Sequence, residues 1–262
     1  MDALSFALAV VAGLIVGILS GMLGVGGGLM MIPLFRLGYA LEAIQATATS
    51  LAVIVPTSLA GLVRHVREGT CVPLLGVTAG LAGSVTSVVG VYLADASPGW
   101  LIMVVAAVVI GASSINMLKK ALRASELELE KDASELLVSK QRMIGFGILV
   151  GLAAGLMAGY IGVGGGIIMI PLFVSVLGLP MKKASGTSLI AVCILAIVGV
   201  VQQWTLGNVQ VVLAIAFACG SIPGAFIGAG LVKRLPERTL RLAFGCFLLV
   251  VAVILALNEL LQ

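Results

Sequence analysis

The sequence predicts an all-α membrane protein made of two inverted-topology repeats, each a glycine-rich re-entrant or broken helical hairpin followed by three transmembrane helices. Composition, an internal duplication and the distribution of basic residues lead to this prediction. Of the 262 residues, 61% are hydrophobic and 10% are charged, and the mean hydropathy is +1.24. A soluble globular domain carries about 25% charged residues. The apolar residues form long runs, which favours helices over a barrel and excludes a soluble enzyme.

An internal duplication divides the chain into two halves. Residues 21–35, GMLGVGGGLMMIPLF, return at residues 159–173 as GYIGVGGGIIMIPLF, an offset of 138 positions. Similarity over this length indicates that one structural unit occurs twice. Charged residues gather between the two copies. We therefore predict a first transmembrane repeat at 1–118, a charged linker at 119–142 and a second transmembrane repeat at 143–262.

Each half contains five apolar runs, and the second run is too short to cross a membrane. The runs lie at 4–23, 28–37, 43–63, 71–94 and 99–118, and again at 143–161, 166–178, 185–204, 208–232 and 239–258. A hydrocarbon core of about 30 Å requires about 20 helical residues. The short runs follow Gly-Val-Gly-Gly-Gly in both halves. We therefore expect a half-helix after a break, with Pro33 and Pro171 as structural hinges.

The basic residues discriminate between two topologies. If the chain continues across the membrane after the glycine break, the 15 Lys and Arg residues divide almost evenly between the two faces. If the chain turns back as a hairpin, the second half is inverted and all of them except Arg36 share one face. Short cytoplasmic loops are enriched in Lys and Arg. We therefore expect an inverted repeat with both termini outside and the linker in the cytoplasm.

The glycine motifs are the strongest candidates for a binding site. Backbone that leaves helical geometry inside a bilayer must be buried in protein or line a cavity, because unpaired amides are costly in hydrocarbon. A half-helix also directs free N–H groups and partial positive charge toward its start. Motifs entering from opposite faces would hold a small anion near the midplane, and hydroxyls on the next helix would add neutral donors. The candidate substrate-binding residues are Gly24, Gly26, Gly27, Gly28, Thr49, Ser50, Gly162, Gly164, Gly165, Gly166, Thr187 and Ser188.

Less specific explanations of the same residues stay open. Glycine-rich stretches in membrane helices often serve only close packing, and Thr or Ser hydroxyls often bond a carbonyl of their own helix. His65, beside Arg64 near a helix end, is interpreted as a solvated interfacial residue. The four cysteines are interpreted as small core residues. The expected partners are a small anionic substrate and the lipid bilayer, with no nucleic acid, no cofactor and no metal; a homodimer is left open.

The combined motifs resemble those of a known family. Gly-x-Gly-Gly-Gly-x4-Pro-Leu occurs at 24–34 and 162–172, each copy is followed by Thr-Ser-Leu, and His65 stands four residues before Gly69. This pattern, which extends over nearly the whole chain, is similar to the sulfite exporter TauE/SafE family of membrane permeases. The resemblance implies transport of sulfite, organosulfonates or related small anions across the bacterial plasma membrane.

The residues and the resemblance together predict a secondary transporter rather than an enzyme. We expect export of small anions, sulfite or organosulfonates first among them, by alternating access between the two repeats. No GxxxxGK[ST] motif for ATP occurs in the sequence. The main alternative is an anion channel that uses the same amides as a selectivity filter. A structural subunit that docks through its linker is another, and an intramembrane enzyme is disfavoured because the apolar runs lack a catalytic constellation.

Overall fold

The computed structural model describes residues 2–123, 140–161 and 164–260, and every regular element in these ranges is an α-helix. The first half contains α1 (Ala3–Leu23), α2 (Gly28–Tyr39), α3 (Ala43–Arg67), α4 (Pro73–Asp95) and α5 (Gly99–Arg123). The second half contains α7 (Lys140–Ile161), α8 (Gly166–Ser175), α9 (Met181–Thr205), α10 (Val211–Val232) and α11 (Glu237–Leu260). The predicted all-α class is confirmed.

Long and short helices occur in the order that the apolar runs predict. Among the described residues, α1, α3, α4, α7, α9 and α10 are the six helices that are long and apolar enough to cross a membrane. By contrast, α2 has 12 residues and α8 has 10, and both begin directly after the glycine motifs. A half-length helix cannot cross a hydrocarbon core of about 30 Å. The chain is therefore a multi-pass membrane protein with a short helix in each half.

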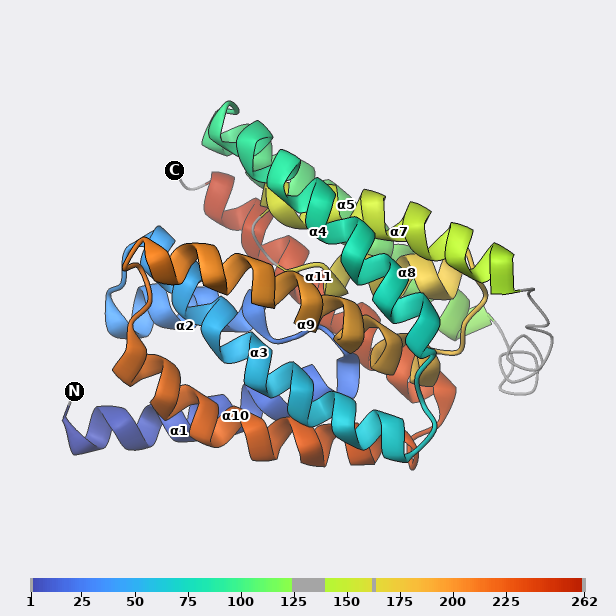
Figure 1. The fold of residues 1–262 in the computed structure, drawn as a ribbon, viewed down its shortest axis with the longest axis horizontal. Coiled ribbons are helices and arrows are strands. Elements are labelled where there is room, and N and C mark those ends of the chain that lie inside the picture. Colours follow the sequence, from blue (N-terminus) through green and yellow to red (C-terminus); the bar gives the residue numbers. More distant parts are fainter. Residues whose placement is uncertain (1, 124–139, 162–163, 261–262) are drawn as a thin grey trace.

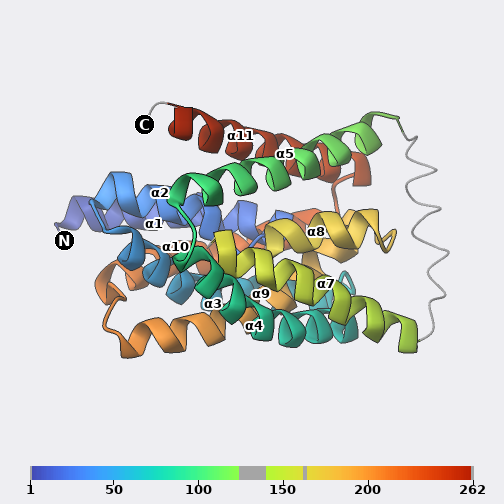
Figure 2. The ribbon, with the colours of Figure 1, turned by 90° about the horizontal axis from the view of Figure 1, so that it is seen from above.

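The two halves pair with each other instead of forming separate bodies. α1 packs along α10, α4 along α7 and α5 along α11, and each pair takes one helix from each half. Figure 1 shows α3 and α9 between the α1–α10 pair and the α4–α7 pair, and Figure 2 shows the α5–α11 pair along one side. The central position of α3 and α9 brings elements of both halves to the middle of the molecule.

Glycines at four-residue spacing bring the paired helices into backbone contact. A Cβ atom added to Gly17 of α1 would lie 2.3 Å from the carbonyl oxygen of Ser221 on α10. At the equivalent place in the second half, a Cβ atom on Gly155 of α7 would lie 2.2 Å from the carbonyl oxygen of Gly83 on α4. Small residues permit this approach, and in lipid such close packing is a main source of helix association.

The ends of the helices divide between two ends of the molecule. In Figures 1 and 2 the start of α1 and the end of α11 lie at the left, whereas the end of α5 and the start of α7 lie at the right. Figure 1 also places the ends of α3 and α10 and the starts of α9 and α11 at the right, while α2 ends at the left. The helix ends that carry most of the basic residues therefore lie together.

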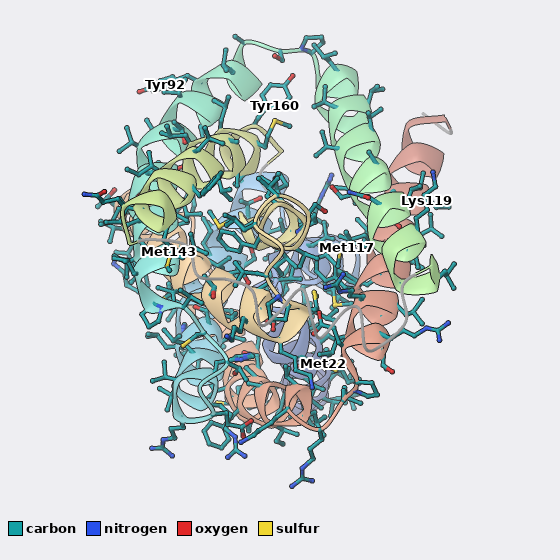
Figure 3. The ribbon with its side chains drawn as sticks, turned by 90° about the vertical axis from the view of Figure 1, so that its right-hand side faces the viewer. Met22, Tyr92, Met117, Lys119, Met143 and Tyr160 are labelled. Carbon is teal, nitrogen blue, oxygen red and sulfur yellow. The ribbon has the colours of Figure 1, made fainter. Side chains whose placement is uncertain are left out.

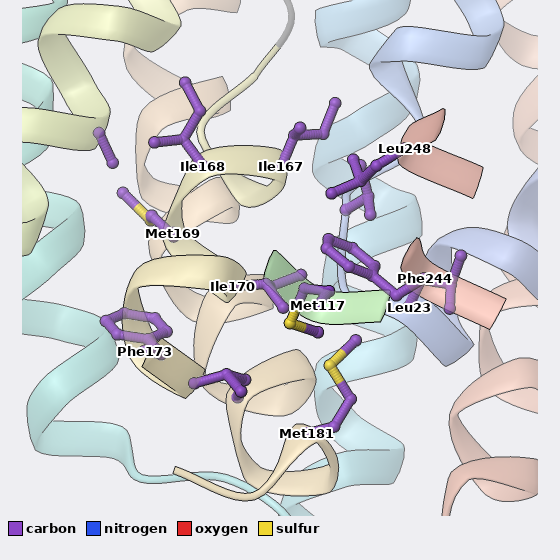
Figure 4. Packing of buried hydrophobic residues seen from close by; sticks show 14 of the residues in the cluster. Leu23, Met117, Ile167, Ile168, Met169, Ile170, Phe173, Met181, Phe244 and Leu248 are labelled. Carbon is purple, nitrogen blue, oxygen red and sulfur yellow. The ribbon is translucent and has the colours of Figure 1, made fainter. Parts of the chain in front are cut away.

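The short helix α8 lies in the interior. Eight of its ten residues are buried, and Figure 3 looks along α8 with helices on all sides. The same view shows Met117 on the inner side of α5 and Lys119 on its outer side, in agreement with their burial. Figure 4 shows Ile167 and Ile170 of α8 beside Leu23 of α1 and Phe244 of α11. This apolar cluster holds the second half-helix next to the end of α1.

Candidate functional site

The first glycine motif forms a buried turn between α1 and α2. The Gly24 amide donates to the Ser20 carbonyl at 2.7 Å, which closes the last turn of α1. Gly24, Gly26 and Gly27 have φ angles of 76°, 79° and 84°, a region in which any side chain is strained. All five motif residues are buried. At the other end of α2, the Tyr39 hydroxyl donates to the Ser5 carbonyl at 3.0 Å, so α2 ends beside the first turn of α1.

The start of α2 presents amides that have no partner among the described residues. Gly27 is the N-cap and provides no side-chain hydrogen bond. Its carbonyl accepts from the amides of Met30 and Met31, each at 3.1 Å, whereas the amides of Gly28 and Leu29 bond no described group. Unsatisfied N–H groups at a helix start carry partial positive charge. This turn therefore offers donors to a negatively charged atom.

The second motif repeats this arrangement in the part that the structure describes. Gly164 has a φ of 75°, and Gly165 is the N-cap of α8, whose carbonyl accepts from Ile168 at 3.2 Å and from Met169 at 2.9 Å. Gly164 is half-buried, whereas Gly165 and Gly166 are buried. Gly162 lies outside the described residues. The start of α8 therefore matches the start of α2 in the bonds to the N-cap carbonyl, but Gly165 has a right-handed backbone (φ −65°) where Gly27 has a left-handed one (φ 84°).

The two motifs contact each other. A Cβ atom added to Gly166 would lie 2.8 Å from the Gly24 carbonyl oxygen and 2.9 Å from the Cα atom of Val25. Val192 of α9 packs against both motifs, because its methyl groups would lie 2.5 Å from a Cβ on Gly26 and 3.0 Å from one on Gly166. The starts of the two half-helices therefore meet at α9.

The four candidate hydroxyls, on Thr49, Ser50, Thr187 and Ser188, make three kinds of contact. The Ser188 hydroxyl contacts the first motif, since it lies 2.8 Å from the carbonyl oxygens of both Gly24 and Ser185. Ser50 instead donates to the Thr47 carbonyl of its own helix at 2.8 Å. Thr187 accepts from the Val72 amide at 2.9 Å, and Thr49 accepts from the Gln210 amide at 3.0 Å. The two threonines therefore hold equivalent loops of the opposite half.

The hinge prolines have different surroundings. Both lie inside their half-helices, but Pro33 is exposed and Pro171 is buried. A proline removes one backbone donor in either setting. Because α8 is enclosed and α2 keeps an exposed face, the two half-helices are not equally constrained.

His65 is buried, so the sequence interpretation of a solvated interfacial residue is wrong. Its side chain is 0% exposed, with Nε2 3.0 Å from the Gly21 carbonyl oxygen and Nδ1 2.7 Å from the Thr70 hydroxyl. The ring also lies against α9, where a Cβ on Gly186 would be 2.9 Å from Nδ1. The neighbouring arginines suggested exposure, but the end of α3 is covered by α1 and α9. His65 therefore joins three helices.

A small cavity lies beside the first motif. Its walls are Leu19, Ser20, Leu23, Val25, Gly27, Leu29, Met30 and Phe247. It offers about 10 Å³ to the centre of a water-sized sphere, which is room for about one water molecule. Most of its walls are apolar. The cavity beside the first motif is therefore small, and its exposed lining is apolar.

Two buried polar residues, Ser20 and Glu237, lie outside the motifs that the sequence singles out. Ser20 lies one turn before Gly24, and the repeat offset pairs it with Ala158, a difference that the alignment of the halves could reveal. Glu237 accepts from the amides of Met181 and Lys182 at the start of α9 and from Arg241 Nε at 3.0 Å. The apolar runs did not indicate that this carboxylate is buried. Sequence alone gives no signal for its contact with α9.

Comparison with known proteins gives a consistent result. The family description Sulfite exporter TauE/SafE matches residues 9–255. A relative from Bacillus subtilis, named "Probable membrane transporter protein YdhB", is 29% identical over 230 residues, covering 87% of this chain and 91% of that protein. A second from the same organism, named "Probable membrane transporter protein YunE", is 26% identical over 254 residues, covering 90% of this chain and 92% of that protein.

A relative from Haemophilus influenzae, named "Probable membrane transporter protein", is 27% identical over 270 residues and covers 94% of this chain and 96% of its own. No solved structure matches the chain. The family and the names of the relatives indicate a membrane transporter rather than an enzyme. Because the family match extends over nearly its whole length, the chain belongs to the sulfite exporter TauE/SafE family.

Proposed function

We propose that the protein is a secondary transporter that exports small anions, with sulfite and organosulfonates as the preferred substrates. The observation that carries the proposal is the contact between the two glycine motifs, each followed by a half-helix whose first amides are unpaired within the described residues. Helix starts of this kind attract oxyanions. Discontinuous helices that meet inside a bundle form the substrate sites of many secondary transporters.

The groups around the meeting point suit a substrate that must leave again. The polar side chains shown beside the first motif, those of Ser20 and Ser188, are neutral. Neutral donors and backbone amides hold an anion without the strong pairing that a buried Lys or Arg would provide. Weak, dispersed binding permits release on the other side of the membrane.

Transport then requires the helices to separate, since the cavity holds about one water molecule and a sulfur oxyanion is larger. We assign the structure to a closed intermediate of an alternating-access cycle in a chain built from two inverted-topology repeats. Because α1 packs on α10 and α7 packs on α4, each rocking body would contain helices of both halves. The glycines at four-residue spacing would keep α1 with α10 and α4 with α7 while the two bodies move.

The proposed orientation follows from the basic helix ends. The ends of α3 and α10 and the starts of α9 and α11 lie with the end of α5, and these ends carry most Lys and Arg residues. The positive-inside rule assigns that end to the cytoplasm of a bacterial plasma membrane. The linker would then be cytoplasmic, and both termini would be outside.

The test is anion flux in proteoliposomes that contain the purified full chain. We expect saturable efflux of radiolabelled sulfite that an inside-negative potential accelerates, because the transported charge is negative. Gly166→Ala should reduce the flux, because the new methyl would lie 2.8 Å from the Gly24 carbonyl oxygen and 2.9 Å from Val25 Cα, which are backbone atoms of the other motif that cannot easily move aside. Gly38→Ala is the matched control, since nothing lies within 4 Å of its added methyl.

Other results would redirect or refute the proposal. Flux that rises linearly with concentration would support the channel alternative, in which the amides act as a filter. Absence of flux for sulfite, methanesulfonate and sulfate by the wild-type chain would exclude the transport of these anions. Equal loss in Gly166→Ala and Gly38→Ala would mean that the contact between the two glycine motifs has no special role.

A further inference from the structure

Two threonines of the repeated Thr-Ser-Leu motif each hold a loop of the opposite half. On α9, Thr187 Oγ1 accepts from the amide of Val72, just before α4, at 2.9 Å. On α3, Thr49 Oγ1 accepts from the amide of Gln210, the N-cap of α10, at 3.0 Å. Both threonines are 0% exposed. The offset of 138 positions relates the threonines to each other and the donors to each other, so the two bonds are copies of one contact.

The two loops have equivalent internal hydrogen bonds. In the loop between α3 and α4, the Thr70 amide donates to the His65 carbonyl at 3.0 Å, and the Thr70 hydroxyl lies 2.7 Å from His65 Nδ1. In the loop between α9 and α10, the Asn208 amide donates to the Gln203 carbonyl at 3.2 Å, and the Asn208 side chain donates to Gln203 Oε1 at 2.7 Å. Because these bonds lie within each loop, they can persist when the loop leaves its threonine.

The two contacts lie at opposite ends of the molecule. Figure 1 shows the α3–α4 loop at the right, where α9 begins, and the α9–α10 loop at the left, where α3 begins. Of the two amide donors, Val72 is half-buried and Gln210 is exposed. Water that enters from one end can bond the amide that a departing threonine leaves unpaired. Each contact can therefore break on its own side at modest cost.

Each contact is connected to the glycine motifs through a central helix. Val192, five residues after Thr187 on α9, packs against both motifs. Its equivalent on α3 is Ile54, five residues after Thr49, which has a methyl 3.4 Å from a Cβ added to Gly26. Both central helices thus contact a loop of the other half near their start and a glycine motif near their middle. A change at either loop can therefore reach the place where the motifs meet.

We propose that these two hydrogen bonds are latches for the two gates of an alternating-access cycle: the Thr187 latch, formed with Val72, and the Thr49 latch, formed with Gln210. The inference rests on the proposed function and deepens it by assigning each gate a residue. Both latches are closed here, as an intermediate shut to both sides requires. Opening toward the cytoplasm breaks the Thr187 latch and keeps the Thr49 latch, and opening toward the outside does the reverse.

The test measures from which face the meeting point of the motifs can be reached. In a chain whose native cysteines are replaced by alanine, Val192→Cys places a thiol beside both motifs. Its rate of reaction with the membrane-impermeant reagent MTSET is followed in right-side-out and inside-out membrane vesicles. This reagent is a cation, so an anion carrier does not transport it.

Equivalent substitutions should have opposite effects in this background. Thr187→Val keeps the size of the side chain but removes the acceptor, so labelling from the cytoplasmic face should accelerate about fivefold or more, with no increase from outside. Thr49→Val should give the same acceleration from outside only. Threonines with a merely structural role would lower the melting temperature without favouring one face.

Three variants serve as controls for the role of the hydroxyl. Thr187→Ser and Thr49→Ser keep an acceptor and should label as the background chain does. Ser114→Ala removes a buried hydroxyl that bonds the Gly245 carbonyl at 2.8 Å, between α5 and α11, and should increase labelling from neither face.

A fourth variant removes the donor instead of the acceptor. Gln210→Pro eliminates the amide of the Thr49 latch, and the φ of −82° at Gln210 suits proline. It should reproduce the effect of Thr49→Val. The Thr49 latch is thereby tested from both of its partners, and the result does not depend on the folding of one variant.

The outcomes separate the latches from the proposed function. If the two Thr→Val variants accelerate labelling from the same face or from neither, or if the Thr→Ser variants behave like them, the latches are refuted; sulfite flux by the wild-type chain would still support the transporter. If the variants open opposite faces although the wild-type chain moves no sulfite, methanesulfonate or sulfate, the latches stand and the transport of these anions is excluded.

Discussion

The two glycine motifs share one sequence but have different surroundings. In the first, all five motif residues are buried beside Ser20 and a small cavity, and the helix that follows exposes Pro33 and Leu34. In the second, Gly164 is half-buried, alanine stands in the place of Ser20, and eight of the ten residues of α8 are buried. The two motifs therefore share their glycines and a short helix, but Gly27 has a φ of 84° where Gly165 has −65°, and the residues around the motifs have diverged.

Only part of the turn is common to the two halves. The equivalent residues Gly26 and Gly164 both have the left-handed backbone that favours glycine, and the short helix follows from the length of the apolar run in each half. Ser20 has no such backbone origin, since alanine occupies the equivalent position 158.

The largest effect is expected from a test of how the halves are oriented. The repeat offset pairs Gly69, after α3, with Gly207, after α9; a Cβ on either residue meets nothing within 4 Å, and a cysteine at either strains a left-handed backbone to the same degree, with φ angles of 69° and 72°. In a chain whose native cysteines are replaced, Gly69→Cys and Gly207→Cys should react with a membrane-impermeant maleimide from opposite faces. Inverted repeats require Gly69→Cys to be labelled from the cytoplasm and Gly207→Cys from outside.

The labelling experiment can refute the inverted arrangement of the two halves. If both cysteines react from the same face, the halves are parallel repeats and the proposed meeting of motifs from opposite sides is excluded. Retained sulfite flux in each variant would show that the cysteines report on the native topology.

Much of the framework could be predicted from the sequence because its causes are local. Apolar runs specify helices in lipid, so the predicted run at 28–37 corresponds to α2 (Gly28–Tyr39) and the run at 208–232 to α10 (Val211–Val232). The glycine breaks could be located for the same reason. These features depend on the chain itself and on the bilayer, and not on which helices become neighbours.

The surroundings of the site depend on neighbours, and here the sequence was a poorer guide. Thr49 and Thr187 look like substrate donors, yet each accepts an amide from a loop of the opposite half. His65 looks exposed, yet α1 and α9 cover it. The Ser20 hydroxyl has no hydrogen-bond partner among the described residues. A missing partner can be recognised only after the helices are packed.

A second difference between the halves concerns the start of α9. Glu237 is 5% exposed and accepts from the first amides of α9 and from Arg241, which is 3% exposed; the offset pairs these residues with Gly99 and Met103. A carboxylate at a helix start is favourable, and removing one partner of a buried pair is strongly destabilising. Glu237→Ala should therefore lower the free energy of unfolding by about 3–5 kcal/mol.

This loss can be measured by denaturant titration of the purified chain in detergent, followed by circular dichroism. Glu42→Ala is a suitable control, because Glu42 is exposed and makes no ion pair with the described residues. A loss for Glu237→Ala no larger than that of the control would show that α9 does not depend on this carboxylate, and the difference between the halves would then be confined to the motifs.

The smallest expected effect concerns the close glycine contacts between paired helices, which both halves share. Gly17→Ala would place a methyl 2.3 Å from the Ser221 carbonyl oxygen, and Gly155→Ala would place one 2.2 Å from the Gly83 carbonyl oxygen. Backbone atoms cannot move aside as a flexible side chain can, so each variant should lose about 1–3 kcal/mol by overpacking. Gly145→Ala, which meets nothing within 4 Å, should be neutral in the same thermal assay. Equal losses at Gly17 and Gly155 would show that both helix pairs are equally intolerant of a side chain, so the halves would differ only in the surroundings of the glycine motifs. A loss at only one of them would mean that the helix pairs themselves have diverged.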